Sequence, residues 1–130
     1  MQIDSSLIQA YLATYFYTDK PIAFHRFCVI TACNPRSKKV SDFDNNLRNK
    51  QLEADLAEHV HQPVLAGDET KQWCEESYIV EISLQKAIEL AKRYEQNAIY
   101  YIEDGDLFLV FVSGEQMNAG TFSEKVRFVR

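Results

Sequence analysis

The strongest restriction on the fold comes from residues 24–33, which read FHRFCVITAC. Successive side chains of a β-strand point to opposite faces of its sheet. The second half of this run is apolar at both sets of alternating positions, which is typical of a strand with two buried faces. The run therefore predicts a buried, central strand, and the other elements must be arranged around it.

The rest of the chain alternates helical and extended patterns. Helical periodicity, with suitable capping residues, occurs in three segments: 5–17, 41–59 and 84–94. Short strands are predicted in four more: 63–67, 77–83, 98–103 and 107–112. The Asp104-Gly105 pair suits a tight hairpin between the last two strands, because glycine adopts positive φ without a steric penalty.

This order matches the βαββαβ plan of a ferredoxin-like, split-βαβ fold. We therefore predict an α+β protein with a mixed or antiparallel sheet, to which an N-terminal helix and a C-terminal hairpin strand are added. Residues 1–114 are expected to form a single α+β domain, and residues 115–130 a C-terminal tail or an edge strand. The plan leaves one face of the sheet open, and the aromatic N-terminal helix is expected to cover it.

Composition narrows the classes of function. A chain of 130 residues with 46% hydrophobic content can bury a core, while a net charge of −5 disfavours an extended nucleic-acid surface. The chain shows neither a leader-like N-terminus nor about 18 uninterrupted apolar residues, which predicts a soluble, cytoplasmic protein with no membrane partner. Its three cysteines have no CxxC spacing, so we expect reduced thiols, no metal and no cofactor.

The basic segment TACNPRSKK, residues 31–39, follows the predicted central strand and leads into a helix. Unpaired N–H groups at a helix N-terminus favour an anion, and Arg36 can add a bidentate grip. One turn of helical spacing separates Asn45 from Arg48, and both should face this loop. If partly buried, these side chains need partners, which are either a ligand or Glu75, Glu76 or a loop carbonyl. The simpler interpretation is a turn bearing solvated lysines.

Four short motifs in a fixed order resemble one bacterial family. They are TACNPRS at 31–37, the spacing of Asn45, Arg48, Leu52 and Leu56, WCEES at 73–77, and QNAI at 96–99. Over about residues 7–112 these motifs resemble the family called domain of unknown function 3293. The resemblance implies no reaction, but it points to these positions: Thr31, Asn34, Pro35, Ser37, Asn45, Arg48, Trp73, Glu76, Gln96 and Asn97.

The chain departs from that family at two positions. Cys33 stands where a tryptophan is usual, which argues against a catalytic cysteine here. Glu95 stands where glycine usually ends the helix, so we expect Gln96 or Asn97 to adopt the left-handed conformation instead.

Other candidate sites have simpler interpretations. Cys33 as a nucleophile lacks a histidine placed to act as its base, and a buried thiol is usually a small hydrophobe. The His59 and His61 pair lacks a fixed third zinc ligand. Glu75 and Glu76 would point in opposite directions in an extended segment, so a salt bridge from Glu76 to Arg48 or Arg36 is favoured over an acid pair.

Two hypotheses of function follow. The leading one is a protein that binds an anionic small molecule or nucleotide in a cleft at the TACNPRS loop and the following helix. Its predicted binding residues are Asn34, Arg36, Ser37, Asn45, Arg48, Trp73, Glu76, Gln96 and Asn97. The alternative is a protein–protein interaction module, such as an inhibitor, adaptor or immunity protein, that uses its acidic surface and exposed aromatic residues. Whether the chain is an enzyme is left open.

Overall fold

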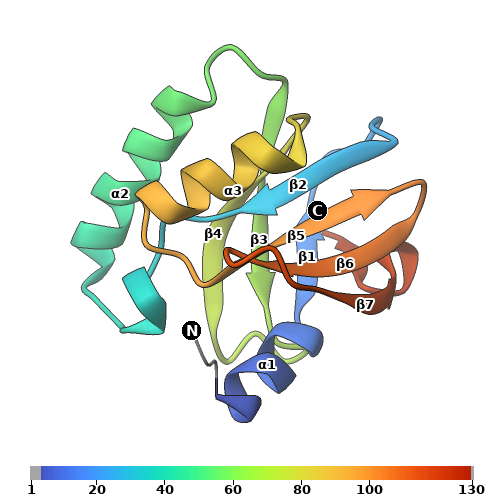
Figure 1. The fold of residues 1–130 in the computed structure, drawn as a ribbon, viewed down its shortest axis with the longest axis horizontal. Coiled ribbons are helices and arrows are strands. Elements are labelled where there is room, and N and C mark those ends of the chain that lie inside the picture. Colours follow the sequence, from blue (N-terminus) through green and yellow to red (C-terminus); the bar gives the residue numbers. More distant parts are fainter. Residues whose placement is uncertain (1–3, 130) are drawn as a thin grey trace.

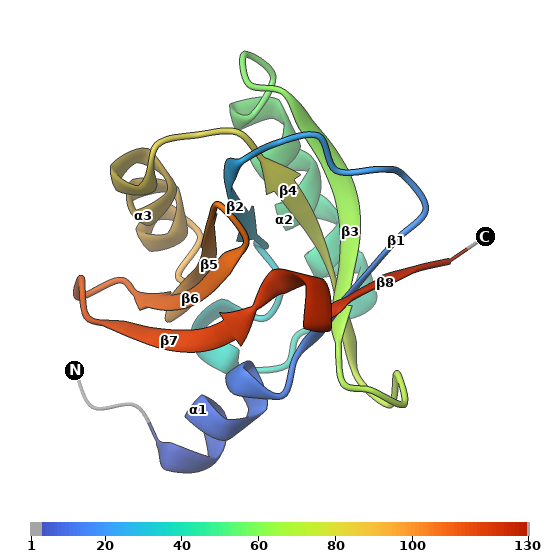
Figure 2. The same ribbon diagram turned by 90° about the vertical axis from the view of Figure 1, so that its right-hand side faces the viewer.

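The fold is described by a computed structural model covering residues 4–129, in which three α-helices accompany one eight-stranded sheet (Figures 1 and 2). The helices are α1 (Ser5–Leu12), α2 (Asp42–Asp55) and α3 (Leu84–Arg93). The strands are β1 (Tyr15–Thr18), β2 (Arg26–Ile30), β3 (His61–Gly67), β4 (Cys74–Val80), β5 (Ala98–Glu103), β6 (Asp106–Phe111), β7 (Gln116–Thr121) and β8 (Val126–Phe128). Among the described residues, no helix is long and apolar enough to cross a membrane.

The prediction of a ferredoxin-like fold is wrong. The strand order is β7-β6-β5-β2-β4-β3-β1-β8, so the sheet is twice as wide as a four-stranded βαββαβ sheet. All neighbours pair antiparallel except β1 and β8, which are parallel. Strand β2 lies in the interior of this order, which confirms the central strand predicted from its apolar faces.

The sheet curls into a half-barrel because its two edges are joined by a short connection. Strands β7 and β8 lie at opposite edges, yet only residues 122–125 separate them along the chain. That connection spans at most about 19 Å, whereas eight flat strands would be about 34 Å across. The edges must therefore approach each other, as Figure 2 shows.

The curl creates two apolar layers. Inside it, Phe16, Phe27, Ile79 and Tyr100 belong to a core that also receives Phe122 from the connection between the edges. On the outer face, α2 and α3 cover a second core (Figure 1), which includes Cys28, Ile30, Leu52, Leu56, Val80, Ala87 and Ala91. Helix α1 packs Ile8, Tyr11 and Leu12 against the inner core at one end of the curl.

Two segments differ from their predicted structure. The N-terminal helix ends at Leu12 instead of continuing to residue 17, and Tyr15–Thr18 form β1, which turns Phe16 into the core. Aromatic and β-branched residues such as these favour strands once a neighbouring strand is present. Within the predicted tail or edge strand of residues 115–130, the local pattern of 116–121 indicates a loop or tail, yet these residues form the edge strand β7.

The predicted local turn chemistry holds at several element ends. Ser41 and Ser83 cap α2 and α3 by accepting hydrogen bonds from the backbone N–H groups of Asp44 and Lys86. Asp104 and Gly105 both have positive φ and join β5 to β6, which confirms the predicted hairpin. The left-handed residue after α3 is Glu95, with φ 58°, and not Gln96 or Asn97 as predicted.

We expect Phe122→Ala to lower the free energy of unfolding by about 3 kcal/mol. The ring of Phe122 is buried and packs against Phe16 and Phe27 inside the curl. Phe128→Ala is the control, because Phe128 in the adjoining β8 is 64% exposed and its loss should change stability by less than about 0.5 kcal/mol. Urea denaturation followed by circular dichroism measures both. Equal, small effects would show that residue 122 does not hold the edges together.

Candidate functional site

A cavity of about 480 Å³ lies where α1 meets the inner face of the sheet. Leu7, Ala10 and Tyr11 of α1 line one side, and Ala66 and Tyr100 of the inner core line another. The polar part of the lining includes Asn34, Ser37, Asn45, Glu75 and Gln96. The volume falls in the range of about 300–1,000 Å³ that small-molecule sites occupy.

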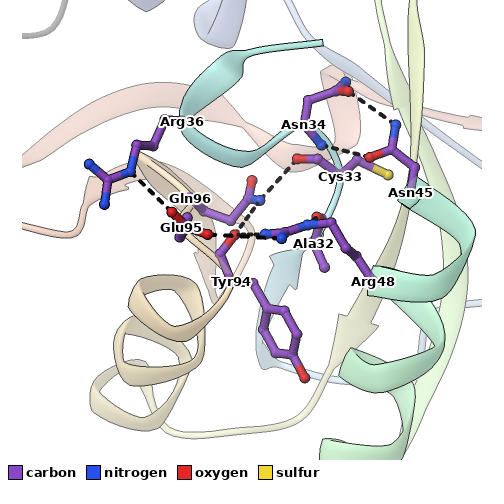
Figure 3. Close-up of polar contacts among 9 residues, drawn as sticks. All are labelled: Ala32, Cys33, Asn34, Arg36, Asn45, Arg48, Tyr94, Glu95 and Gln96. Carbon is purple, nitrogen blue, oxygen red and sulfur yellow. Dashed lines mark hydrogen bonds and ion pairs between the residues drawn. The ribbon is translucent and has the colours of Figure 1, made fainter. Parts of the chain in front are cut away.

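A reciprocal pair of asparagines fixes the loop that follows β2. The Asn34 backbone N–H donates to Asn45 Oδ1 at 2.8 Å, and Asn45 Nδ2 donates back to Asn34 Oδ1 at 3.0 Å (Figure 3). The Val40 N–H donates to the same Asn34 oxygen at 3.1 Å. Asn34 holds a left-handed backbone, a conformation that asparagine tolerates better than most residues. The predicted convergence of this loop with the start of α2 is therefore present.

Glu75 projects into the cavity because of its register in β4. Strand residues alternate between faces, so Glu75 shares the inner face with Ser77 and Ile79, whereas Glu76 shares the outer face with Tyr78 and Val80. Asn34 Nδ2 donates to Glu75 Oε2 at 2.8 Å. Burial raises the pKa of Glu75, and the Asn34 hydrogen bond partly offsets that increase.

Trp73 is positioned by the tight turn between β3 and β4. Asp68 Oδ1 accepts a hydrogen bond from the Gln72 N–H at 2.7 Å, and the Asp68 N–H donates to the Trp73 carbonyl at 3.3 Å. A Cβ atom on Gly67 would lie 2.5 Å from that carbonyl, so the turn requires glycine there. The Trp73 side chain lines the cavity and remains 38% exposed.

Arg48 lies outside the cavity lining and joins three elements. Its Nε donates to the Ala32 carbonyl at 2.6 Å, and its Nη2 donates to the Tyr94 carbonyl at the end of α3 (Figure 3). Its Nη1 lies 3.9 Å from Glu95 Oε1. All of these partners are protein atoms, so Arg48 of α2 holds the end of β2 against the end of α3.

Arg36 also pairs with Glu95 and lies outside the cavity lining. Its Nε is 3.3 Å from Glu95 Oε2, and its side chain is largely exposed. The Arg36 backbone N–H donates to the Glu95 carbonyl at 2.6 Å. Gln96 Nε2 donates to the Cys33 carbonyl at 2.9 Å, which ties the same two loops together. The basic residue predicted to grip an anion is thus held at the surface.

The structure brings together five of the nine predicted site residues and leaves four elsewhere. Those that line the cavity are Asn34, Ser37, Asn45, Trp73 and Gln96; those that do not are Arg36, Arg48, Glu76 and Asn97. Asn97 lies close by, since its Nδ2 donates to Ser37 Oγ at 3.0 Å, and that oxygen is 3.2 Å from the Tyr11 hydroxyl. The salt bridge predicted from Glu76 to an arginine is made by Glu95 instead.

Sequence reasoning missed the role of Asn49, a buried polar residue of α2. Its Oδ1 accepts a hydrogen bond from the Ala32 N–H at 2.9 Å, and its Nδ2 donates to the Glu76 carbonyl at 2.9 Å. Asn49 lies one helical turn before Leu52 and so belongs to the buried stripe of α2. This spacing could have identified it as a buried polar residue. Glu75 was considered as a hydrogen-bonding partner and as half of an acid pair, but it was not among the predicted binding residues, although its spacing from Ile79 places both on one face of a strand.

The other chemical candidates do not form reactive groupings in the described residues. Cys33 is buried, and this burial raises the pKa of its thiol, as for a packed side chain. His61 Nδ1 lies 2.9 Å from the carbonyl oxygen of His59. Within residues 4–129, no group of three or more histidine, cysteine, aspartate or glutamate side chains is placed to hold a metal ion.

Together the fold and cavity define an α+β protein with a half-barrel sheet and a partly polar pocket beneath α1. A family model described as "Protein of unknown function (DUF3293)" matches residues 30–99, which is more than half of the chain. The chain therefore belongs to this family, and the resemblance noted in its motifs is confirmed over a shorter span than 7–112. No curated protein and no solved structure matches the chain.

We expect Arg48→Met to lower the free energy of unfolding by about 2 kcal/mol, because it leaves the Ala32 and Tyr94 carbonyls without a charged donor. Arg36→Met is the matched control and should change stability by less than about 0.5 kcal/mol, since its ion pair is exposed. Guanidinium denaturation of both variants measures the difference. If the two arginines proved equivalent, Arg48 would not be the structural connection described above.

We expect Glu75→Gln to raise the Tm at neutral pH by on the order of 2–4 °C. A raised pKa in the folded state means that this carboxyl stabilises the fold at acid pH and loses that contribution as pH rises through the folded value. Glutamine stays neutral and can still accept the Asn34 hydrogen bond. Thermal melts across pH should show the gain vanishing below the ordinary glutamate pKa, with Glu76→Gln as control. A lower Tm for Glu75→Gln at neutral pH would contradict this account.

Proposed function

We propose that this protein binds a small polar molecule in the cavity beneath α1. The observation that carries the proposal is the hydrogen-bonded set of Asn34, Asn45 and Glu75 on the cavity wall. Small-molecule sites typically combine an apolar lining with a few polar groups held in fixed positions. Val29, Ala98 and Ile99 supply apolar lining here, and the asparagine pair fixes the polar part.

The backbone of the loop supports the same proposal. Asn34, Arg36 and Ser37 all have positive φ, within four consecutive residues and none of them glycine. Such conformations are costly and concentrate at ligand-binding sites, where the surrounding contacts maintain them. The Asn34 and Asn45 hydrogen bonds and the Arg36 N–H to Glu95 bond provide that support.

The anionic ligand or nucleotide expected from the sequence stays a prediction. Arg36 and Arg48, which were predicted to bind the anion, pair with Glu95, and Arg48 also donates to backbone carbonyls. This weakens the argument for a phosphate at this loop. Most of the polar side chains in the cavity lining carry amide, carboxyl or hydroxyl groups, and Lys39 adds an exposed ammonium group. A polar organic molecule fits this lining better than a bare phosphate does.

The alternative, a protein-interaction module, has one specific observation in its favour. Phe43 and Leu47 lie one turn apart on α2 and are 71% and 48% exposed. Exposed apolar residues on a helix are often contact points for partner proteins. Against it, the aromatic side chains of Phe16, Tyr17 and Tyr100 are buried and cannot contact a partner.

A cavity-filling substitution tests the proposed function. Ala66 lines the cavity and is the register partner of Glu75, so Ala66→Leu places a larger apolar side chain beside the polar wall. We expect thermal-shift screening against a panel of polar metabolites to give at least one ligand for the wild type. Ala66→Leu should weaken that ligand at least about tenfold, or about 1.4 kcal/mol, by filling its space.

The matched control is Ala54→Leu, the same change at an exposed position of α2. This variant should bind like the wild type. Ala66→Leu should also remain folded, because the added side chain enters an existing cavity and not a filled core. A panel without any ligand sensitive to Ala66→Leu, together with one stoichiometric protein partner sensitive to Phe43→Ala, would reject the proposal in favour of the interaction module.

A further inference from the structure

The charges on the cavity wall are unevenly placed. Acidic Glu75 and Asp42 line it, whereas Lys39 is the sole basic lining residue within residues 4–129. Glu75 is partly buried, while Asp42 and Lys39 are exposed to solvent. Salt and water weaken the fields of exposed charges far more than those of buried ones. The charge that a bound ligand meets inside the cavity is therefore mainly that of the Glu75 carboxylate.

Asn34 binds one oxygen of this carboxylate and leaves the other without a side-chain partner. Because Asn34 Oδ1 accepts from Asn45 Nδ2 and the Val40 N–H, its amide nitrogen is directed to Glu75 Oε2. Across residues 4–129, no hydrogen bond or ion pair from another side chain reaches the other carboxylate oxygen, Oε1. No fully buried side-chain oxygen or nitrogen in that part of the chain lacks a partner, so Oε1 is not fully buried, and Glu75 lines the cavity.

A desolvated carboxylate with no cationic partner is costly, and folded proteins normally pair or neutralise such a group. Arg36 and Arg48 lie outside the cavity lining and pair with Glu95, so the side-chain hydrogen bond to the Glu75 carboxylate comes from a neutral donor, Asn34. The raised pKa of Glu75 has the same origin, because burial penalises its charged form. A cation that enters the cavity would remove this penalty by pairing with the free oxygen.

Aromatic side chains surround the same space. Tyr11, Trp73 and Tyr100 line the cavity together with Glu75. The hydroxyl of Tyr100 donates to the Tyr11 carbonyl at 2.7 Å, and the Tyr11 hydroxyl is 3.2 Å from Ser37 Oγ, so both hydroxyl groups are engaged within the protein. Aromatic rings attract organic cations through their electron-rich faces, and tryptophan does so most strongly.

We propose that the ligand of this cavity is an organic cation, an alkylamine that carries an aromatic group, whose protonated nitrogen pairs with Glu75 and whose aromatic group packs against Trp73. This inference rests on the proposed small-molecule function and specifies the charge and shape of the ligand. It replaces the arginine grip expected from the sequence with a carboxylate and aromatic site. Asn34 is the positioning residue that holds Glu75, and it need not contact the ligand.

Three probes with one aromatic body test the charge directly: 2-phenylethylammonium, 2-phenylethanol and phenylacetate. Trp73 is the single tryptophan of the chain, so its fluorescence reports binding at this site. We expect the cation to bind at least about tenfold more tightly than the alcohol or the anion, a difference of about 1.4 kcal/mol. Glu75→Gln should reduce the affinity for the cation to that for the alcohol.

Glu76→Gln is the matched control, since it makes the same change in net charge one residue away on the outer face of β4. It should keep the preference for the cation. The assignment is overturned by equal affinities, by a preference for phenylacetate, by a cation preference that survives Glu75→Gln, or by no binding of any probe. A metabolite whose binding is still sensitive to Ala66→Leu would, in each of those cases, leave the small-molecule function standing. If, in addition, no metabolite showed binding that is sensitive to Ala66→Leu, both the cation assignment and the small-molecule function would be rejected.

Discussion

The short connection between β7 and β8 determines the shape of this protein. Four residues join the two edges of an eight-stranded sheet, so the sheet cannot lie flat. The resulting curl gives the sheet an inner face small enough to be filled by aromatic side chains, including Phe122 from the connection itself. It also leaves one end of that face open, and α1 covers this end. The cavity exists because α1 closes the opening without filling it.

Within this frame, polar side chains have two separate roles. Arg48 and Asn49 of α2 contact backbone groups of Ala32 just after β2, of β4 and of the end of α3, and so hold the outer layer together. Asn34 and Asn45 instead fix the loop at the cavity and direct one amide to Glu75. Polar side chains of similar type thus contribute either to stability or to the cavity, depending on which face of the sheet they contact.

Local patterns were sufficient to predict some of the fold. The apolar faces of β2, the caps of α2 and α3, and the Asp104-Gly105 hairpin depend on neighbouring residues only, and all were predicted. Strands β7 and β8 were not assigned as a pair of edges, because QMNAGT and VRF have weak strand patterns and owe their conformation to pairing with distant strands. The prediction of the overall topology was wrong for the same reason, since no local pattern indicates how the two edges of a sheet meet.

The site was partly predictable for a related reason. The loop and helix that converge at Asn34 and Asn45 are close in sequence, so helical spacing identified them. The choice between Glu75 and Glu76 depended on where β4 begins, and the strand starts at Cys74, earlier than its pattern indicated. The destination of Arg48 depended on the end of α3, almost fifty residues away along the chain.

The parallel pairing of β1 with β8 has a consequence for biosynthesis. The first and last strands of the sheet are neighbours, so the half-barrel lacks one of its edges until residues 126–128 have left the ribosome. Until then β1 presents an unpaired edge, and Phe16 and Phe27 lack the ring of Phe122. Pairings between such distant segments form slowly, and exposed edges invite aggregation. The edge of β1 and the inner aromatic core are thus exposed to aggregation until residues 126–128 have emerged.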